Sequence, residues 1–418
     1  DINGLEVRAV LPFRPEYKLS GSVSGGIYPA HAIHPDGIAL QAIPFPGIPA
    51  SQLYEALQDS GFQPHSEKNG VVQLHLPAGQ IPNLTAHPGI MYIETEEPAP
   101  TAEGIRGRSL HGANWLSPAP GLGYDGSGIV LSIGDDGSIN HADFKGRMHD
   151  HTEYNLGSHG DMTAGLAVGS GNINPMGSGM ATGAELHLFG IDNYTHLLDA
   201  PQYFQQYGAV ITSTSYGEGC GGEYTSSAQG LDQQVNDVNE LLHFFSSGNS
   251  SAVDCSPTYQ NIQHPDGHFY GNITGGRKSA KNVLAIGNLD YDGQLRASSS
   301  RGPTVDGRIK PDLCAQGQGN LTTNGNNGYS WASGSSAASP VAAGATAMLY
   351  QAYKTHNNDQ LPSSALIKAI LLNTAIDLGR PGPDFDYGWG KLDAASALEV
   401  IENQQYLQGS INQAGVHT

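Results

Sequence analysis

The segment Gly334-Ser335-Ser336-Ala337-Ala338-Ser339-Pro340 opens a long stretch of small residues, which continues through alanines and one glycine to Ala347. Small side chains let a helix approach its neighbours closely, so the stretch predicts a buried helix at the centre of a domain. Ser336, near the start of that helix, would face free backbone N–H groups and the positive end of the helix dipole. Both would stabilise an oxyanion, which makes Ser336 a candidate nucleophile; a simple N-cap serine is the alternative.

Two earlier segments offer the partners that a hydroxyl nucleophile needs. The apolar, β-branched run Ile129-Val130-Leu131-Ser132-Ile133 predicts a buried strand, and Asp135-Asp136-Gly137 follows at its carboxyl end, where open α/β sheets bind ligands. His159-Gly160 precedes small and apolar residues that predict a helix over 159–168. A histidine at such a helix start can project into a cleft. Asp135, His159 and Ser336 are therefore candidate acid, base and nucleophile, with Asp136 as a rival for the acid.

A fourth segment, Ser246-Ser247-Gly248-Asn249, lies between the histidine and the serine and offers a side-chain amide for an oxyanion hole. The order Asp, His, Ser separates one family from others that reach the same triad geometry. In these segments the chain resembles the subtilisin-like serine proteases, the subtilases, and among them the bacterial alkaline subtilases. It departs from the family pattern at Ser335, where the family usually has Thr, and at Asp161-Met162, where it usually has Thr-His.

The resemblance implies an α/β fold, the subtilisin-like three-layer fold with a mainly parallel sheet. The alternation of patterns agrees with it. Strands are expected at 129–133, 186–191, 209–213, 242–246 and 283–286, and helices at 159–168, 197–207 and 229–241. Blocks at 298–302, 309–313, 366–372 and 387–390 also match the family.

Residues 1–103 have a different pattern, with strands expected at 38–46, 71–76 and 90–95 and helices at 51–58 and 80–84. This order resembles the small α+β ferredoxin-like propeptides that precede subtilase catalytic domains, and residues 1–37 would add a strand or an arm. Pro98, Pro100 and residues 101–108 predict an exposed linker. The resemblance implies that this linker is cleaved between Pro100 and Arg108. The expected domains are a propeptide at 1–103, a catalytic domain at 104–403, and a tail or the start of a truncated module at 404–418.

Composition narrows the possible partners. The chain has 418 residues, with 39 acidic and 19 basic side chains and a net charge of −20, which argues against nucleic acid as a partner. The sequence contains no apolar run long enough for a membrane span. The excess of carboxylates offers oxygen ligands for structural calcium, whereas catalysis would need no cofactor. His149-Asp150-His151 offers two ligands for a transition metal, but no third has a recognisable spacing, so a polar loop is expected and metal ligands stay unassigned.

Three cysteines occur in the chain. In a subtilase, the loops that hold Cys220 and Cys255 flank one substrate cleft, so the resemblance implies a disulfide between them. Cys314 has an apolar context and is expected to be a buried free thiol.

The resemblance implies a secreted or extracellular serine endopeptidase, made as a zymogen, that acts on protein or peptide substrates and is inhibited by its own propeptide. The oxyanion hole would consist of Asn249 and the Ser336 backbone N–H, assisted by Ser335. An extended substrate would pair with Ser215-Tyr216-Gly217, and these residues with Ser247-Gly248 would form the wall of the P1 pocket. The alternative is a binding module with the subtilase fold, kept silent by a docked propeptide.

Overall fold

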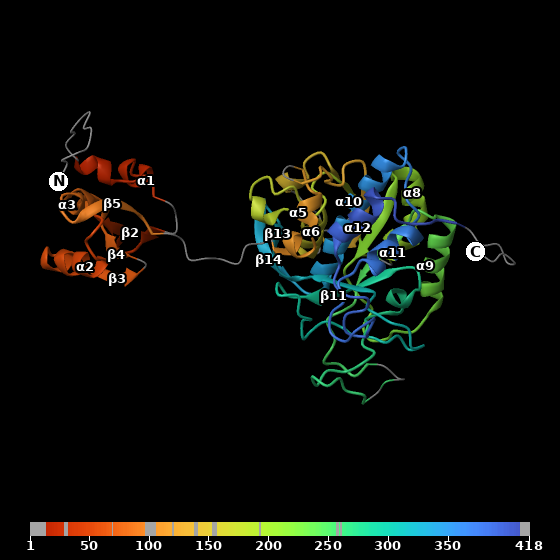
Figure 1. Cartoon of the computed structure of the whole chain (residues 1–418). Coiled ribbons are helices and arrows are strands. Elements are labelled where there is room, and N and C mark those ends of the chain that lie inside the picture. Colours follow the sequence, from red (N-terminus) through yellow and green to blue (C-terminus); the bar gives the residue numbers. More distant parts are fainter. Residues whose placement is uncertain are drawn as a thin grey trace. The chain divides into compact units, whose positions relative to one another are not determined.

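The structure, a computed structural model, divides the chain into two compact units, Asp1–Thr101 and Ala102–Thr418 (Figure 1). It describes residues 14–28, 32–68, 70–96, 106–118, 121–137, 141–152, 157–191, 194–255, 259 and 261–409. Among the helices in these ranges, none combines the length and the apolarity that crossing a membrane would require. Most of the expected linker, residues 97–105, lies outside the described residues.

The N-terminal unit is a small α+β module with the ferredoxin-like order βαββαβ, in which neighbouring strands are antiparallel and the sheet order is β3-β4-β2-β5. Its elements are β2 (Gly37–Pro44), α2 (Ala50–Asp59), β3 (Pro64–Lys68), β4 (Val71–Leu76), η3 (Ala78–Gln80), α3 (Ile81–Thr85) and β5 (Ile90–Thr95). Strand β3 was missing from the predicted pattern. Its sequence, Pro64-His65-Ser66-Glu67-Lys68, lacks the apolar alternation by which a half-buried strand is recognised.

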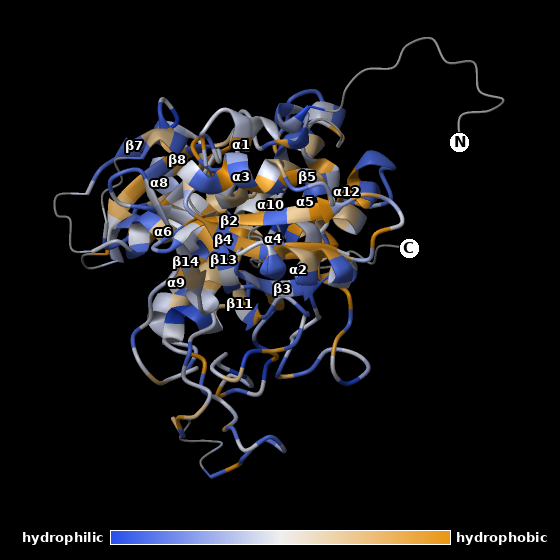
Figure 2. Ribbon diagram, turned by 90° about the vertical axis from the view of Figure 1, so that its left-hand side faces the viewer, coloured by the Kyte–Doolittle hydropathy of each residue, from blue (hydrophilic) through white to orange (hydrophobic). Residues whose placement is uncertain are grey.

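Hydrophobic packing joins the sheet and helices of this unit. β2 is hydrophobic along most of its length (Figure 2), and Leu53 and Leu57 of α2 are buried in the same core as Leu40 and Ile93. The segment before β2 contains η1 (Pro15–Lys18), α1 (Gly21–Ser24) and β1 (Ile33–His34). The expected additional strand or arm therefore includes a two-residue strand, β1, which pairs with the start of β2.

The second unit is built on a seven-stranded sheet in the order β12-β11-β10-β9-β6-β8-β7, and every neighbouring pair in it is parallel. This confirms the predicted fold class. The strands are β6 (Val130–Asp135), β7 (Met148–Asp150), β8 (Glu185–Gly190), β9 (Ala209–Thr214), β10 (Leu242–Ser246), β11 (Leu284–Leu289) and β12 (Leu313–Gln316). β7 was not predicted: His149 and Asp150, two of its three residues, were expected in a polar loop, because polar side chains give no strand pattern.

Helices cover both faces of this sheet. Phe244 and Phe245 follow each other on β10 and therefore point to opposite faces. Phe244 belongs to the core that includes α6 and α10, whereas Phe245 packs with residues of α7 and α9. The bounds of these four helices, and of α8, which follows α7 in the chain, are α6 (His159–Val168), α7 (Thr195–Leu198), α8 (Ala200–Tyr207), α9 (Ser226–Asp237) and α10 (Ser335–His356). The single helix expected at 197–207 is divided into α7 and α8, because Pro201 in the first turn of α8 cannot donate a hydrogen bond to α7.

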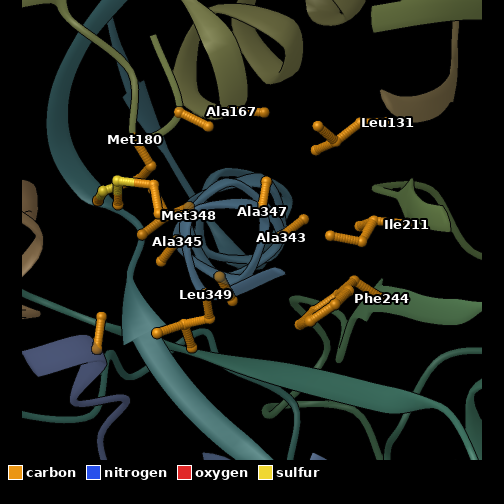
Figure 3. Close-up of a cluster of buried hydrophobic side chains, with 14 of the residues drawn as sticks. Leu131, Ala167, Met180, Ile211, Phe244, Ala343, Ala345, Ala347, Met348 and Leu349 are labelled. Atoms are coloured by element: carbon orange, nitrogen blue, oxygen red, sulfur yellow. The ribbon is translucent and has the colours of Figure 1, made fainter. Parts of the chain in front are cut away.

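α10 is the predicted central helix. Figure 3 shows Ala343 and Ala347 of α10 beside Leu131, Ile211 and Phe244, which come from three strands of the sheet. The alanines bring the helix close to the strands, so the start of α10 is held rigidly at the carboxyl edge of the sheet. The other elements of the unit are α4 (Arg106–Leu110), α5 (Ala113–Leu116), η4 (Ala142–Phe144), η5 (Pro175–Gly177), η7 (Gly276–Ser279), β13 (Gln318–Asn324), β14 (Gly328–Ser333), α11 (Ser364–Asn373) and α12 (Ala394–Glu402).

Two terminal segments of this unit are more ordered than expected. Arg108 was assigned to an exposed linker, but it lies in α4 and is buried, and its guanidinium donates hydrogen bonds to the carbonyls of Gly179 and Met180. The two carbonyls stabilise the buried Arg108 guanidinium, and burial lowers the pKa of this group to about 10. In the expected tail, the Gln408 amide donates to the hydroxyl of Tyr353 on α10 at 2.9 Å. Residues 410–418 lie outside the described part of the chain.

Candidate active site

The topology of the sheet brings the candidate acid and base together. β6 lies between β8 and β9: the chain runs from β6 to β7 and β8 on one side and then crosses over to β9 on the other, so the carboxyl end of β6 is a switch point at which α/β proteins bind ligands. Asp135 is the last residue of β6, and His159 is the first residue of α6. Their side chains meet: His159 Nδ1 lies 2.7 Å from Asp135 Oδ1.

Asp135 is buried and its two carboxylate oxygens have different partners. Its side chain is only 3% exposed, Oδ1 faces the His159 ring, and Oδ2 accepts a hydrogen bond from Thr163 Oγ1 at 2.9 Å. The rival acid, Asp136, instead accepts a hydrogen bond from the backbone N–H of Gly160 at 3.0 Å, at the start of α6. The geometry thus gives Asp135 the contact with the ring and Asp136 the contact with the helix end. The sequence analysis did not assign Thr163 to the site.

The environment of His159 favours its protonated form. Burial alone would lower the pKa of His159, but the hydrogen bond to Asp135 and the charges of Asp135 and Asp136 outweigh burial and raise this pKa. With Nδ1 protonated toward Asp135, Nε2 keeps its lone pair and is free to accept a proton. The His159 side chain is 35% exposed, so the ring is accessible from solvent. This pair therefore has the arrangement of a general base with an orienting carboxylate.

Ser336 is held at the start of α10 by reciprocal hydrogen bonds with Ser215. The Ser336 hydroxyl donates to the Ser215 carbonyl at 2.9 Å, and the Ser215 hydroxyl donates to the Ser336 carbonyl at 2.9 Å. Pro340 explains the second bond: it has no N–H to give to the carbonyl four residues earlier, so the Ser336 carbonyl needs another donor. Within the described part of the chain, no hydrogen bond joins the Ser336 hydroxyl to the His159 ring.

Asn249 lies directly against the start of α10. Its Oδ1 accepts a hydrogen bond from the Ser335 backbone N–H at 2.9 Å, which leaves the Nδ2 donors to point elsewhere. Gly334 has φ +117°, and a Cβ there would lie 3.2 Å from Asn249 Nδ2, so the tight approach requires glycine. The buried Ser335 hydroxyl accepts from the Gly248 backbone N–H at 3.1 Å. Ser335 thus orients the Asn249 amide through its backbone N–H, while its hydroxyl holds the backbone of Gly248, the residue before Asn249.

Two of the five expected substrate-binding residues line a pocket. Tyr216 and Gly217 line a small pocket; Ser215 and Ser247 are buried, and Gly248 is engaged with Ser335. The pocket is completed by residues that the sequence analysis did not assign: Tyr194, Thr214, Glu218, Phe245, Thr274, Gly275, Arg277 and Lys278. No local motif marks them, because they meet only through the fold.

Lys278 is a buried cation at this pocket. Its ammonium donates to Thr274 Oγ1 at 2.8 Å and to Ser246 Oγ at 3.4 Å, and burial lowers the pKa of Lys278 to about 7. The neighbouring Arg277 has a charged partner instead: its guanidinium pairs with Glu218 and also lies over the Tyr194 ring.

The predicted disulfide is not present in the structure. Cys220 and Cys255 are both free thiols. The two thiols are nevertheless close to each other. Burial is the main cause that raises the pKa of Cys255 to about 12, and the neighbouring Cys220 thiol adds to the rise. Cys314 is buried and free, as expected.

No group of three carboxylates that could hold calcium occurs among the described side chains. Each group of three potential ligands in the described ranges includes at least one histidine, whose nitrogen does not suit a hard cation that prefers oxygen. The buried carboxylate of Asp143 already accepts hydrogen bonds from the backbone of Gly171 and Asn172 and from the Tyr329 hydroxyl. Structural calcium therefore stays a prediction without assigned residues.

A parallel α/β sheet with an aspartate–histidine pair and a helix-start serine at its carboxyl edge defines the subtilisin-like class of fold. The family model of the subtilase family matches residues 126–390. The chain therefore belongs to the subtilase family, the subtilisin-like serine proteases.

Comparisons with individual proteins agree with this assignment. The chain is 26% identical over 302 residues to subtilisin-like protease SBT6.1 of Arabidopsis thaliana and 27% identical over 304 residues to membrane-bound transcription factor site-1 protease of Mus musculus. These matches cover 67% and 68% of this chain but only 27% and 26% of those proteins, so the chain spans about a quarter of the length of these curated relatives.

Solved structures show the same fold at lower identity. The CspB protease of Clostridium perfringens superposes with a TM-score of 0.57 at 17% identity, covering 72% of this chain and 99% of that one. The prenylagaramide maturation protease PagA superposes with a TM-score of 0.52 at 22% identity, covering 65% of this chain and 94% of that one.

Proposed function

We propose that the chain is a serine endopeptidase in which Ser336 is the nucleophile, His159 the general base and Asp135 the orienting acid. The observation that carries this proposal is the 2.7 Å contact between His159 Nδ1 and Asp135 Oδ1 in a member of the subtilase family. Support also comes from the position of Ser336 at the start of α10, where the helix dipole and free N–H groups favour negative charge.

In the proposed reaction, the Ser336 hydroxyl turns from the Ser215 carbonyl toward His159 and attacks the carbonyl carbon of the scissile bond. Its proton passes to His159 Nε2 as the new C–O bond forms, and Asp135 stabilises the resulting imidazolium. His159 then gives this proton to the leaving amine as the C–N bond breaks, which leaves an acyl-enzyme. Water, deprotonated by His159, attacks the ester; the acid product departs and Ser336 regains its proton.

The oxyanion of each tetrahedral intermediate would accept hydrogen bonds from the Asn249 amide and the Ser336 backbone N–H. The Ser335 backbone N–H supports this role by donating to the Asn249 oxygen, so that the amide hydrogens remain available for the oxyanion. Ser335 would therefore assist by positioning Asn249.

The test of the nucleophile is covalent labelling with a fluorophosphonate, followed by mass spectrometry of the modified peptide. A label on Ser336 that disappears in Ser336→Ala is the expected result. Ser333→Ala is the matched control, because this exposed serine lies three residues earlier in the chain and should not affect labelling. A label that persists in Ser336→Ala would contradict the proposal.

We also propose that the enzyme is made as a zymogen whose N-terminal unit is the inhibitor. The ferredoxin-like order of β2 to β5 supports this role, as does the high effective concentration of a segment tethered to the same chain. The cut is expected between Pro100 and Arg108, and the buried Arg108 favours a position before α4.

A time course on a denaturing gel, with the new N-terminus identified by mass spectrometry, tests the zymogen proposal. Wild-type protein should be cut once at this junction, Ser336→Ala should remain one chain, and added residues 1–103 should inhibit the processed enzyme. A fully active chain that keeps residues 1–103 would contradict it. Absence of both labelling and processing would favour the second candidate, a binding module silenced by a docked propeptide.

A secreted or extracellular location is a further part of the proposal. It is supported by membership of the family alone. Fractionation of the producing cells should place the processed enzyme outside the cytoplasm, and retention of all of it inside would contradict this location.

A further inference from the structure

A group of histidines and a glutamate lies at the β7 edge of the parallel sheet, away from the candidate triad. Glu185 and His187 alternate on β8 and therefore project from the same face, and His149 of β7 is the direct register partner of His187. Adjacent strands are about 4.8 Å apart, so parallel pairing brings the three side chains together although β7 and β8 are separated by α6. The His149 and His187 rings stack with centroids 4.6 Å apart.

The potential ligand atoms of this group lie close together. His149 Nε2 lies 2.8 Å and His187 Nε2 lies 3.5 Å from Glu185 Oε1, and the three potential ligand atoms are all within 4.8 Å of one another. In a tetrahedral zinc site with bonds of about 2.0–2.1 Å, ligand atoms are about 3.3 Å apart. Because the two rings are stacked with an interplanar angle of 23°, one of them must rotate before both Nε2 lone pairs can point at one ion, and His149, the more exposed of the two, is the ring that would rotate.

His151, directly after β7, prepares His187 for this role. His151 Nε2 lies 2.9 Å from His187 Nδ1. If His187 Nδ1 carries the hydrogen and donates it to His151, then His187 Nε2 presents its lone pair toward Glu185 and His149. Metal-binding histidines are commonly oriented in this way by a partner at the other ring nitrogen. His151 also stacks on Phe189, with centroids 4.7 Å apart, so its ring is held by packing.

We propose that His149, Glu185 and His187 bind a divalent transition metal, with zinc as the best match. Two imidazoles and one carboxylate are a ligand set that zinc uses, whereas calcium prefers oxygens only. His149 is 50% and Glu185 45% exposed, so an ion can enter from solvent and a water molecule can complete its coordination, while His187, at 4%, is the buried anchor.

The site is distinct from the candidate triad and does not depend on the proposed peptidase activity. Glu185 is the first residue of β8 and pairs with Val130, the first residue of β6, whereas Asp135 is the last residue of β6 and pairs with Gly190. The two groups thus lie toward opposite ends of the same parallel strands. A metal here would join β7, a three-residue edge strand, to the body of the sheet.

The experiment uses the full chain carrying Ser336→Ala, so that neither processing nor autolysis affects the result. After treatment with a chelator and its removal, zinc is titrated by calorimetry, and cobalt(II) is added separately to record its visible absorption. Glu185→Gln and His149→Asn are each compared with the parent. His75→Asn is the matched control, because His75 belongs to two other groups of potential ligands, both in the N-terminal unit.

The expected result is one zinc ion whose dissociation constant rises at least tenfold in both Glu185→Gln and His149→Asn but not in His75→Asn, and a cobalt spectrum typical of tetrahedral coordination. Calcium should not compete. Circular dichroism of the metal-free variants checks that they are folded. Equal zinc affinity in the parent and both site variants, or a loss that follows only His75→Asn, would overturn the proposal and leave a hydrogen-bonded polar cluster at this edge.

Discussion

Two groups of histidine and carboxylate lie toward opposite ends of one parallel sheet, and they differ mainly in the burial of the carboxylate. The Asp135 side chain is 3% exposed and binds one imidazole, with Thr163 on its other oxygen. The Glu185 side chain is 45% exposed and lies near two imidazoles. A buried, saturated carboxylate can orient and stabilise one ring, whereas a half-exposed one between two rings leaves room for an ion and water. Burial thus directs similar residues toward proton transfer or toward metal binding.

The largest expected effect is on peptide hydrolysis and leaves the histidine–glutamate group at the β7 edge unchanged. Ser336→Ala should lower kcat for peptide hydrolysis by about 10⁶-fold, because no other described group replaces the hydroxyl that forms the acyl-enzyme. Zinc affinity at the β7 edge should not change. Hydrolysis of casein and zinc titration of the same preparation measure both, with Ser333→Ala as control. A residual rate within about 10²-fold of the wild type would remove Ser336 from its assigned role.

Asp135→Asn tests whether the buried carboxylate acts through the ring. kcat/KM should fall about 10⁴-fold, because an amide at this position stabilises the wrong tautomer of His159. The pH profile should also move: Asp135 raises the pKa of His159 against the effect of burial, and the base must be neutral, so wild-type activity falls as the pH drops through this raised pKa. In the variant the acid limb should shift to lower pH. An unshifted limb would show that Asp135 does not orient the base.

Asn249→Ala should lower kcat by about 10²–10³-fold with little change in KM, because the amide donates mainly to the oxyanion of the intermediate. Steady-state kinetics on a peptide substrate separates the two constants. A rise in KM at constant kcat would instead make Asn249 a residue that binds the ground state.

Lys278→Met tests the buried cation near the active-site end of the sheet. The pKa of Lys278 is about 7 in the folded protein, against an ordinary value of 10.5, so the unfolded chain binds more protons between these pH values. The free energy of unfolding should therefore rise with pH across this window, by up to about 1.4 kcal/mol per unit, and the slope should flatten in Lys278→Met. Urea unfolding of the Ser336→Ala background at several pH values measures it, and identical slopes would mean that Lys278 stays charged when folded.

The smallest expected effect is that of Glu185→Gln on catalysis, and it tests whether the two ends of the sheet act independently. Glu185→Gln should leave kcat/KM within about twofold of the wild type, since surface changes away from the site act weakly. Assays with and without added zinc provide the measurement. A loss comparable to that of Asn249→Ala would show that the edge of the sheet is coupled to catalysis.

Local patterns were sufficient to predict much of the second unit. The predicted strand 242–246 and helix 159–168 coincide with β10 and α6, because each is a compact apolar run whose burial is visible in the sequence. Asp135, His159 and Ser336 stand at the ends of such elements, so finding the elements also located these residues. Two polar strands, β3 and β7, were not predicted. They are held in place by neighbouring strands and carry few apolar residues of their own.

The sequence by itself determined the order of the acid, base and nucleophile segments, the central helix with Pro340, and the parallel fold, because these depend on residue types at short spacing. Only the tertiary structure decided that Ser215 satisfies the carbonyl freed by Pro340, that Lys278 is buried beside Tyr216, and that Cys220 and Cys255 meet as free thiols. The same holds for Glu185 and His187, which join His149 through the register of parallel strands. Register between distant strands is set by the packing of the whole sheet, which no local spacing records.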